Sequence, residues 1–157
     1  INIFSYNDVD LAKFRNQSIG FVFQFHHLLP EFSALENVML PAMISGSENG
    51  KIEKNAMHLL KEVGLEHRAR HRPGELSGGE QQRLAVARSL INSPKLILAD
   101  EPSGNLDKSS SQSLHRLFWD LNNRTNQTII IVTHNMDLAQ KADRIIELSD
   151  GRIKLTQ

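Results

Sequence analysis

The chain alternates between short continuous apolar runs and longer stretches in which apolar residues recur at helical spacing. The continuous runs are rich in β-branched and aromatic residues, which predicts buried strands. They cover residues 19–23 (IGFVF), 95–99 (KLILA) and 128–133 (TIIIVT). The uninterrupted apolar character of 95–99 is typical of a parallel strand that is buried on both faces.

Between these strands, apolar residues spaced as on one face of a helix predict helical segments. These segments cover residues 34–44, 52–63, 79 or 80 to 91, and 109–122. Near the end of the chain, residues 144–148 and 152–155 flank Asp150 and Gly151, a pair that suits a tight hairpin turn. The order of strand, helical insert, strand, helix, strand, short helix and hairpin predicts an α/β fold with a parallel sheet.

Overall composition narrows the function classes. The 157 residues suit one domain, and 18 basic residues balance 18 acidic ones, so no global field attracts nucleic acid or an anionic membrane. The basic stretch 67–72 has no interleaved aromatic residue, and we expect a solvated loop rather than a nucleic-acid site. The apolar runs of the chain are shorter than the roughly 20 residues of a membrane-spanning helix, which predicts no direct membrane insertion.

The motif Leu-Ser-Gly-Gly-Glu-Gln-Gln-Arg at residues 76–83 leads directly into a predicted helix. Gly78 and Gly79 allow the backbone to approach an anion, and Ser77 can donate to a phosphate oxygen at the helix start. An ordinary capped helix explains the same residues, with Ser77 as N-cap and Glu80 completing a capping box. The motif alone leaves both interpretations open.

Polar residues follow two of the predicted strands. Asp100 and Glu101 end one strand, where the first carboxylate can hold Mg²⁺ and the second can act on water. His134 ends the next strand, where it can hydrogen-bond a transferring phosphoryl group. A solvated acidic loop and a polar loop histidine are the alternatives. Gln24 ends the first strand, so all four side chains should meet at one edge of the sheet.

The succession of Gln24, the Ser-Gly-Gly motif, the acidic strand end, the loop 103–107 and His134 resembles the ABC ATPase family. The resemblance implies a P-loop NTPase (RecA-like) core and a head-to-tail homodimer that binds ATP and Mg²⁺. It implies a core strand and glutamine loop at 1–30, a helical subdomain at 31–76, and the remaining motifs at 77–157. The family's site residues, carried over by motif, are Gln24 for Mg²⁺ and the attacking water, Asp100 for Mg²⁺, Glu101 as base, His134 for the γ-phosphate, and Ser77, Gly78, Gly79, Glu80 and Asp107 for the nucleotide.

Residues 23–38 (FQFHHLLPEFSALENV) are similar to the lipoprotein-releasing ATPases within this family. This finer resemblance implies integral membrane partner subunits (LolC/LolE-like) and a peripheral location at the cytoplasmic face of the bacterial inner membrane. The ATPase parts of macrolide exporters and the division-associated FtsE remain alternatives, as does a soluble ABC ATPase. A metal site at His26 and His27 is disfavoured, because no third ligand lies at useful spacing.

A phosphate-binding loop, Gly-x-x-x-x-Gly-Lys-Ser/Thr, does not occur in these 157 residues. The family places this loop and a β-subdomain before the glutamine loop, and the chain begins with Ile1. We therefore expect an amino-terminal truncation that leaves apolar sheet surface uncovered. We also expect residues 1–157 alone to show no ATP turnover.

Overall fold

The computed structural model describes residues 3–46 and 48–156. The strands are β1 (Ile19–Phe23), β2 (Leu96–Asp100), β3 (Thr128–Val132), β4 (Ile146–Ser149) and β5 (Arg152–Thr156). The α-helices are α1 (Asp8–Ser18), α2 (Ala34–Ile44), α3 (Asn49–Glu62), α4 (Gly78–Leu90), α5 (Lys108–Thr125) and α6 (Met136–Ala139). Short 3₁₀ turns cover Ile3–Ser5, Glu66–Arg68 and Pro73–Glu75.

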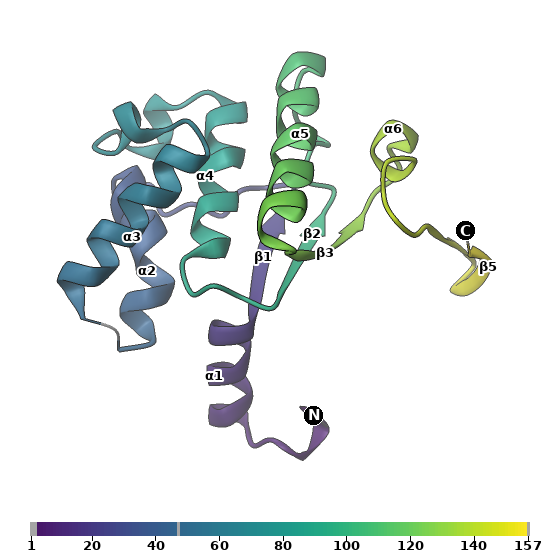
Figure 1. The fold of residues 1–157 in the computed structure, drawn as a ribbon, viewed down its shortest axis with the longest axis horizontal. Coiled ribbons are helices and arrows are strands. Elements are labelled where there is room, and N and C mark those ends of the chain that lie inside the picture. The colour runs from purple at the N-terminus through teal and green to yellow at the C-terminus, as the bar shows by residue number, and fades with distance from the viewer. Residues whose placement is uncertain (1–2, 47, 157) are drawn as a thin grey trace.

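The central sheet has three parallel strands in the order β1-β2-β3, which confirms the predicted α/β arrangement. Its register aligns Phe23 with Asp100 and Asp100 with Val132, so all three strands end at the same level. Helices α4 and α5 lie over one face of the sheet, while α2 and α3 pack on the far side of α4 (Figure 1). The carboxyl edge of the sheet is therefore free to carry a site.

Two apolar clusters form the core. One lies among α2, α3 and the turns that follow, and the other lies between the sheet and α5. Helix α4 contributes to both, because Leu84 and Ala87 face the helical cluster whereas Val86 faces the sheet. A displacement of α4 would therefore disturb the packing of both clusters.

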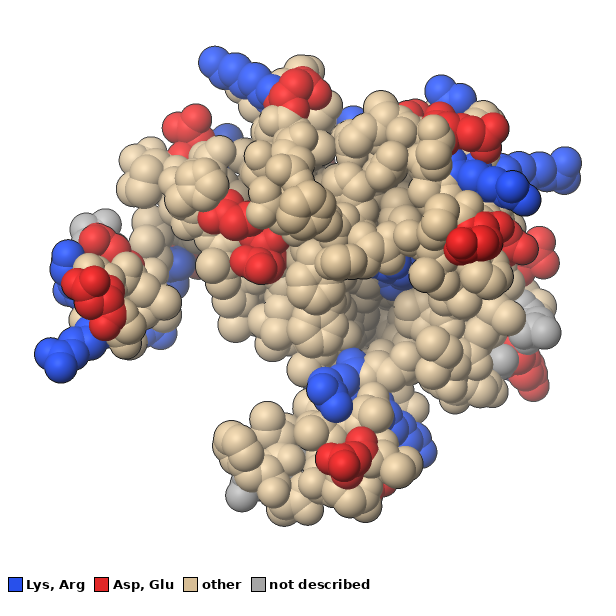
Figure 2. Space-filling view, turned by 180° about the vertical axis from the view of Figure 1, so that it is seen from behind, with Lys and Arg blue, Asp and Glu red and all other residues tan. Residues whose placement is uncertain are grey.

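The second face of the sheet is open. Phe21, Phe23, Ile130 and Val132 point to this face, and Val132 is 61% exposed. Seen from behind, the middle of this face is largely uncharged, with most charged side chains around it (Figure 2). The expectation that 95–99 is buried on both faces holds for one face only, since Leu96 and Leu98 are half-buried on the open face, and the expectation of uncovered apolar sheet surface is confirmed.

Two features lie outside the main body. Helix α1, which the sequence pattern did not predict, projects from the start of β1 and buries none of its side chains (Figure 1). The predicted hairpin is confirmed as antiparallel β4 and β5, with positive φ at Asp150 and Gly151 in the turn. None of the helices in the described ranges is long and apolar enough to span a membrane.

Candidate functional site

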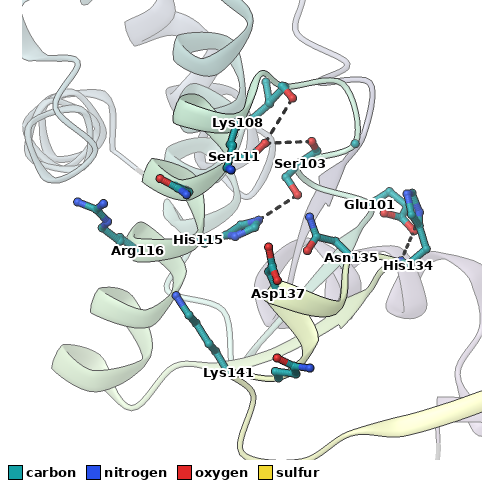
Figure 3. Close-up of a pocket in the computed structure, with 14 residues that line it drawn as sticks. Glu101, Ser103, Lys108, Ser111, His115, Arg116, His134, Asn135, Asp137 and Lys141 are labelled. Atoms are coloured by element: carbon teal, nitrogen blue, oxygen red, sulfur yellow. Dashed lines mark hydrogen bonds and ion pairs between the residues drawn. The ribbon is translucent and has the colours of Figure 1, made fainter.

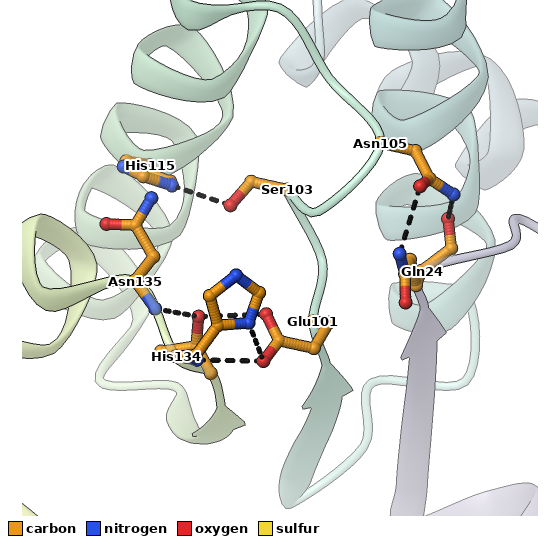
Figure 4. Close-up of polar contacts among 8 residues, drawn as sticks. Gln24, Glu101, Ser103, Asn105, His115, His134 and Asn135 are labelled. Atoms are coloured by element: carbon orange, nitrogen blue, oxygen red, sulfur yellow. Dashed lines mark hydrogen bonds and ion pairs between the residues drawn. The ribbon is translucent and has the colours of Figure 1, made fainter.

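The carboxyl edge of the sheet brings together the polar residues predicted for it. Gln24 follows β1, Asp100 ends β2 with Glu101 next to it, and His134 lies two residues beyond β3. Because the strands end at a common level, these residues follow one another along the same edge of the sheet, where Gln24, Glu101 and His134 can be seen in Figure 4. Asp100 is exposed there.

Glu101 is held firmly by the segment after β3. Its Oε1 accepts hydrogen bonds from the backbone N–H of His134 at 2.8 Å and from the ring Nδ1 of His134 at 2.7 Å. Its Oε2 accepts from the hydroxyl of Thr133 at 3.1 Å. Glu101 also has a φ of 41°, a left-handed conformation that is uncommon for residues other than glycine. A strained backbone and three donors thus fix the carboxylate, as is frequent at functional sites.

Gln24 lies against the loop that follows β2. Its side-chain Nε2 donates to Oδ1 of Asn105 at 2.9 Å, and Nδ2 of Asn105 lies 3.5 Å from the backbone oxygen of Gln24. A methyl group added at Gly104 would meet Nε2 of Gln24 at 3.0 Å. The glutamine therefore rests on a glycine, with its amide nitrogen turned toward Asn105.

At the start of α4, the two interpretations of the Ser-Gly-Gly motif are compatible. Ser77 is the N-cap: its Oγ accepts from the N–H of Glu80 at 3.3 Å, and Glu80 Oε2 accepts from the N–H of Ser77 at 2.8 Å. The Ser77 hydroxyl uses only an acceptor position, so its hydrogen can still be donated. The amides of Gly78 and Gly79 precede the first intrahelical bond and suit an anion. The capping box therefore fixes the orientation of the Ser77 hydroxyl and of the Gly78 and Gly79 amides.

The Glu80 carboxylate is also tied to the helical insert. Its Oε1 accepts from Nε of Arg68 at 3.2 Å. The hydrogen bond from the Ser77 backbone, more than the other contacts, holds the pKa of Glu80 below its usual value. Glu80 is therefore ionised at neutral pH and links the motif to the turn at Glu66–Arg68.

The motif also contacts the start of α5. A methyl group on Gly79 would meet Oγ of Ser110 at 2.9 Å and Cβ of Ser110 at 3.0 Å. Asp107 caps α5 by accepting from the N–H groups of Ser109 at 2.9 Å and Ser110 at 3.0 Å. Hydrogen bonds from Ser110, its side chain foremost, lower the pKa of Asp107. Asp107 is thus placed near the motif, where its visible contacts are those of a helix cap.

Sequence reasoning missed the residues of α4 that hold the segment after Gln24. Gln82 is 0% exposed, donates to the backbone oxygen of Phe23 at 3.1 Å and makes a short hydrogen bond with the His26 ring. The two terminal nitrogens of Arg88 donate to the backbone oxygens of His27 at 2.6 Å and His26 at 2.8 Å. No local motif marks these contacts, because they join positions about 60 residues apart in the chain.

The loop after Glu101 is held in place by a contact with α5. Ser103 is buried, and its hydroxyl lies 3.0 Å from Nε2 of the buried His115 on α5. Burial, more than the nearby Lys141, lowers the pKa of His115, while Asp137 opposes the shift. These residues line a hollow of about 740 Å³ between α5 and α6 that opens beside Glu101 and His134 (Figure 3).

The oxygen atoms at this edge fit a magnesium ion that is shared with phosphates. Such an ion takes one or two protein carboxylates and keeps its other positions for phosphate and water. Asp100 offers an exposed carboxylate, and Oε1 of Gln24 receives no hydrogen bond from any described residue. No group of three His, Cys, Asp or Glu side chains within 3–46 and 48–156 could form a cage made by the protein alone.

Comparison with known proteins agrees with this geometry. The model of the ABC transporter family matches residues 3–104. The chain belongs to the ABC transporter ATPase family. It is 58% identical over 147 residues to the lipoprotein-releasing system ATP-binding protein LolD of Cytophaga hutchinsonii, covering 94% of this chain and 67% of that protein. It is 56% identical over 152 residues to LolD of Bacteroides fragilis, covering 97% and 70%.

Solved ABC cassettes share the fold. The dimeric post-hydrolysis structure of the cassette MJ0796 with ADP and Pi has a TM-score of 0.85 and 39% identity, over 98% of this chain and 68% of that one. A second dimeric MJ0796 structure gives a TM-score of 0.85 and 40% identity, over 97% and 67%. The P-loop NTPase fold class is confirmed. The chain spans about two thirds of the length of these relatives.

Proposed function

We propose that this chain is the hydrolytic part of an ABC ATPase that powers the release of lipoproteins from the bacterial inner membrane toward the outer membrane. The observation that carries the proposal is the similarity to LolD proteins, at 55–58% identity along at least 92% of the chain. The arrangement of side chains at the edge of the sheet supports the hydrolytic half of the assignment.

In this proposal Glu101 is the general base that takes a proton from the attacking water. Oε1 of Glu101 accepts both donors of His134, whereas Oε2 accepts only the Thr133 hydroxyl and so keeps an acceptor position for the attacking water. A carboxylate only accepts, so ring Nδ1 of His134 carries the proton of that bond. The other ring nitrogen, Nε2, would face the γ-phosphate.

Magnesium bound with ATP would neutralise charge on the phosphate oxygens, and Asp100 and Gln24 would hold it. Ser77, Gly78 and Gly79 would bind the nucleotide held by a second copy of the protein, with Glu80 orienting them. Asp107 would contribute at the same interface. The dimeric MJ0796 cassettes support such an assembly.

The segment between β1 and α2 offers an apolar surface to membrane subunits of the LolC/LolE type. Phe25 is 68% exposed, and Leu29 and Phe32 of the same segment are also exposed. Large exposed apolar side chains in one region are typical of protein contacts. Such contacts would place the ATPase at the cytoplasmic face of the inner membrane without inserting it.

Proteoliposomes containing the membrane subunits and the protein made from its complete reading frame test this function. We expect ATP to release a labelled lipoprotein, and Glu101→Gln to lower turnover at least 100-fold while trapping an ATP-bound dimer, since a general base contributes about 10²–10⁴. Glu147→Gln, on the exposed strand β4, is the matched control. Unchanged turnover in Glu101→Gln would remove its role as base.

Two further outcomes bear on the proposal. ATP turnover without lipoprotein release would refute the cargo and favour an exporter-like or FtsE-like system. Residues 1–157 alone should show no ATP turnover, because the sequence contains no phosphate-binding loop. Robust turnover by that polypeptide would contradict the proposal that these residues supply the hydrolytic groups but not the phosphate-binding loop.

A further inference from the structure

The loop after Glu101 forms a firm platform beside Gln24. Gly104 donates its N–H to the backbone oxygen of Glu101 at 3.0 Å, which closes a turn. Buried Ser103 is bound to His115, and Asp107 caps α5 at the end of the loop. Asn105 is exposed on this platform, at the point where Gln24 leaves β1 (Figure 4).

Two contacts fix the orientation of the Gln24 carboxamide. Nδ2 of Asn105 is turned toward the backbone oxygen of Gln24, which can only accept. Oδ1 of Asn105 consequently faces the side chain of Gln24, which must present its NH₂ group, and the 2.9 Å bond is the result. If the Gln24 carboxamide were flipped, its Oε1 would face Oδ1 of Asn105, and the two oxygens would repel each other. The backbone of Gln24 therefore sets the orientation of its own side chain through Asn105.

The fit against Gly104 adds a steric condition. A methyl group there would lie 3.0 Å from Nε2, 3.2 Å from Cδ and 3.4 Å from Cγ of Gln24. The two shorter separations are tighter than ordinary van der Waals contact, so a side chain at 104 would push the carboxamide away by a few tenths of an ångström.

We propose that Asn105 is a positioning residue that holds the Gln24 amide nitrogen and thereby leaves Oε1 free and outward for the magnesium ion. The inference rests on the proposed function, in which Gln24 contacts that ion. Magnesium accepts oxygen ligands and not an amide nitrogen. Without Asn105 the amide would turn freely, and part of the population would present the wrong atom.

The first experiment reads the contact without nucleotide. In ¹⁵N-labelled protein from the complete reading frame, the Gln24 side-chain NH₂ signals are assigned by their loss in Gln24→Glu. We expect Asn105→Ala to move these signals to positions typical of a free amide, and Asn105→Asp, which keeps an acceptor, to hold them close to the wild type. Gly104→Ala should shift them as well, whereas Gly50→Ala, with open space around it, should not. Unmoved signals in Asn105→Ala would overturn the proposal.

The second experiment separates positioning from general damage. Asn105→Ala should raise the Mg²⁺ concentration for half-maximal ATPase rate about three- to tenfold, the equivalent of one hydrogen bond, with kcat at saturating Mg²⁺ preserved. In a Gln24→Ala background the same substitution should have no further effect. A lower kcat with unchanged Mg²⁺ dependence, or an additive loss in the double variant, would overturn the positioning role. An inactive wild-type protein would refute the proposed function instead, and the NMR result would stand by itself.

Discussion

Gly78 and Gly79 provide a matched pair that separates packing from nucleotide contact. A methyl group on Gly78 would meet only Cδ2 of Leu106 at 3.7 Å, an ordinary contact. On Gly79 it would meet both Oγ and Cβ of Ser110, at 2.9 and 3.0 Å. Oγ can rotate, but Cβ moves only if the first turn of α5 moves. We expect Gly79→Ala to destabilise the protein and Gly78→Ala to leave it as stable or more so.

The magnitude follows from two opposing terms. Overpacking a tight contact costs about 1–3 kcal/mol. Replacing glycine by alanine at a compatible helical position stabilises by about 0.4–1 kcal/mol, because the unfolded chain has fewer conformations to lose. With the overpacking cost near the middle of its range, about 2 kcal/mol, the net loss for Gly79→Ala is about 1–1.6 kcal/mol. For Gly78→Ala only the stabilising term remains.

Urea unfolding of the nucleotide-free protein from the complete reading frame measures this difference. With a slope of about 2 kcal/mol per molar urea, Gly79→Ala should lower the midpoint by roughly 0.5–0.8 M relative to the wild type. Gly78→Ala should not lower it. Equal midpoints for the two variants would refute the argument that Gly79 is required for packing against α5, whatever the variants do to ATP turnover.

Two further substitutions test the supports of the site. Arg88→Lys loses the two-pronged contact with the backbone after Gln24 and should cost about 1–2 kcal/mol in urea unfolding, since Lys cannot hold two carbonyl oxygens in that geometry; an unchanged midpoint would contradict this. The lowered pKa of His115 means that the unfolded chain takes up a proton first, so its contribution to stability is complete above about pH 6.5 and declines as the pH falls below that value. His115→Gln should flatten the pH dependence of the unfolding midpoint below pH 6.5, with the slope from His26 remaining, whereas the exposed control His58→Gln should not.

The order of strands and helices was predictable because each buried element shows its own periodicity. Helix α1 could not be found that way, since a helix that buries none of its side chains needs no apolar stripe. The open sheet face was not visible in the pattern of the strands, and was expected only because the sequence contains no phosphate-binding loop. The run at 95–99 is apolar at successive positions whether or not something covers the second face, so sequence alone predicted burial on both sides.

The composition of the site was predictable, but its internal contacts were not. Parallel strands must end at one edge, which brings Gln24, Asp100, Glu101 and His134 together without further information. The bond between Gln24 and Asn105 joins positions 81 residues apart and depends on the register of β1 against β2. No pattern along the chain specifies that register to one residue.

The glycines of the motifs show why this matters for function. Read from sequence, Gly79 exists to let a phosphate approach, yet its missing side chain also makes room for Ser110 on α5. Gly104 similarly makes room for Gln24. Each small residue thus joins two parts of the site before any nucleotide arrives. A loss of turnover on replacing either glycine does not identify a nucleotide contact unless the stability and the Gln24 amide signals are measured beside it.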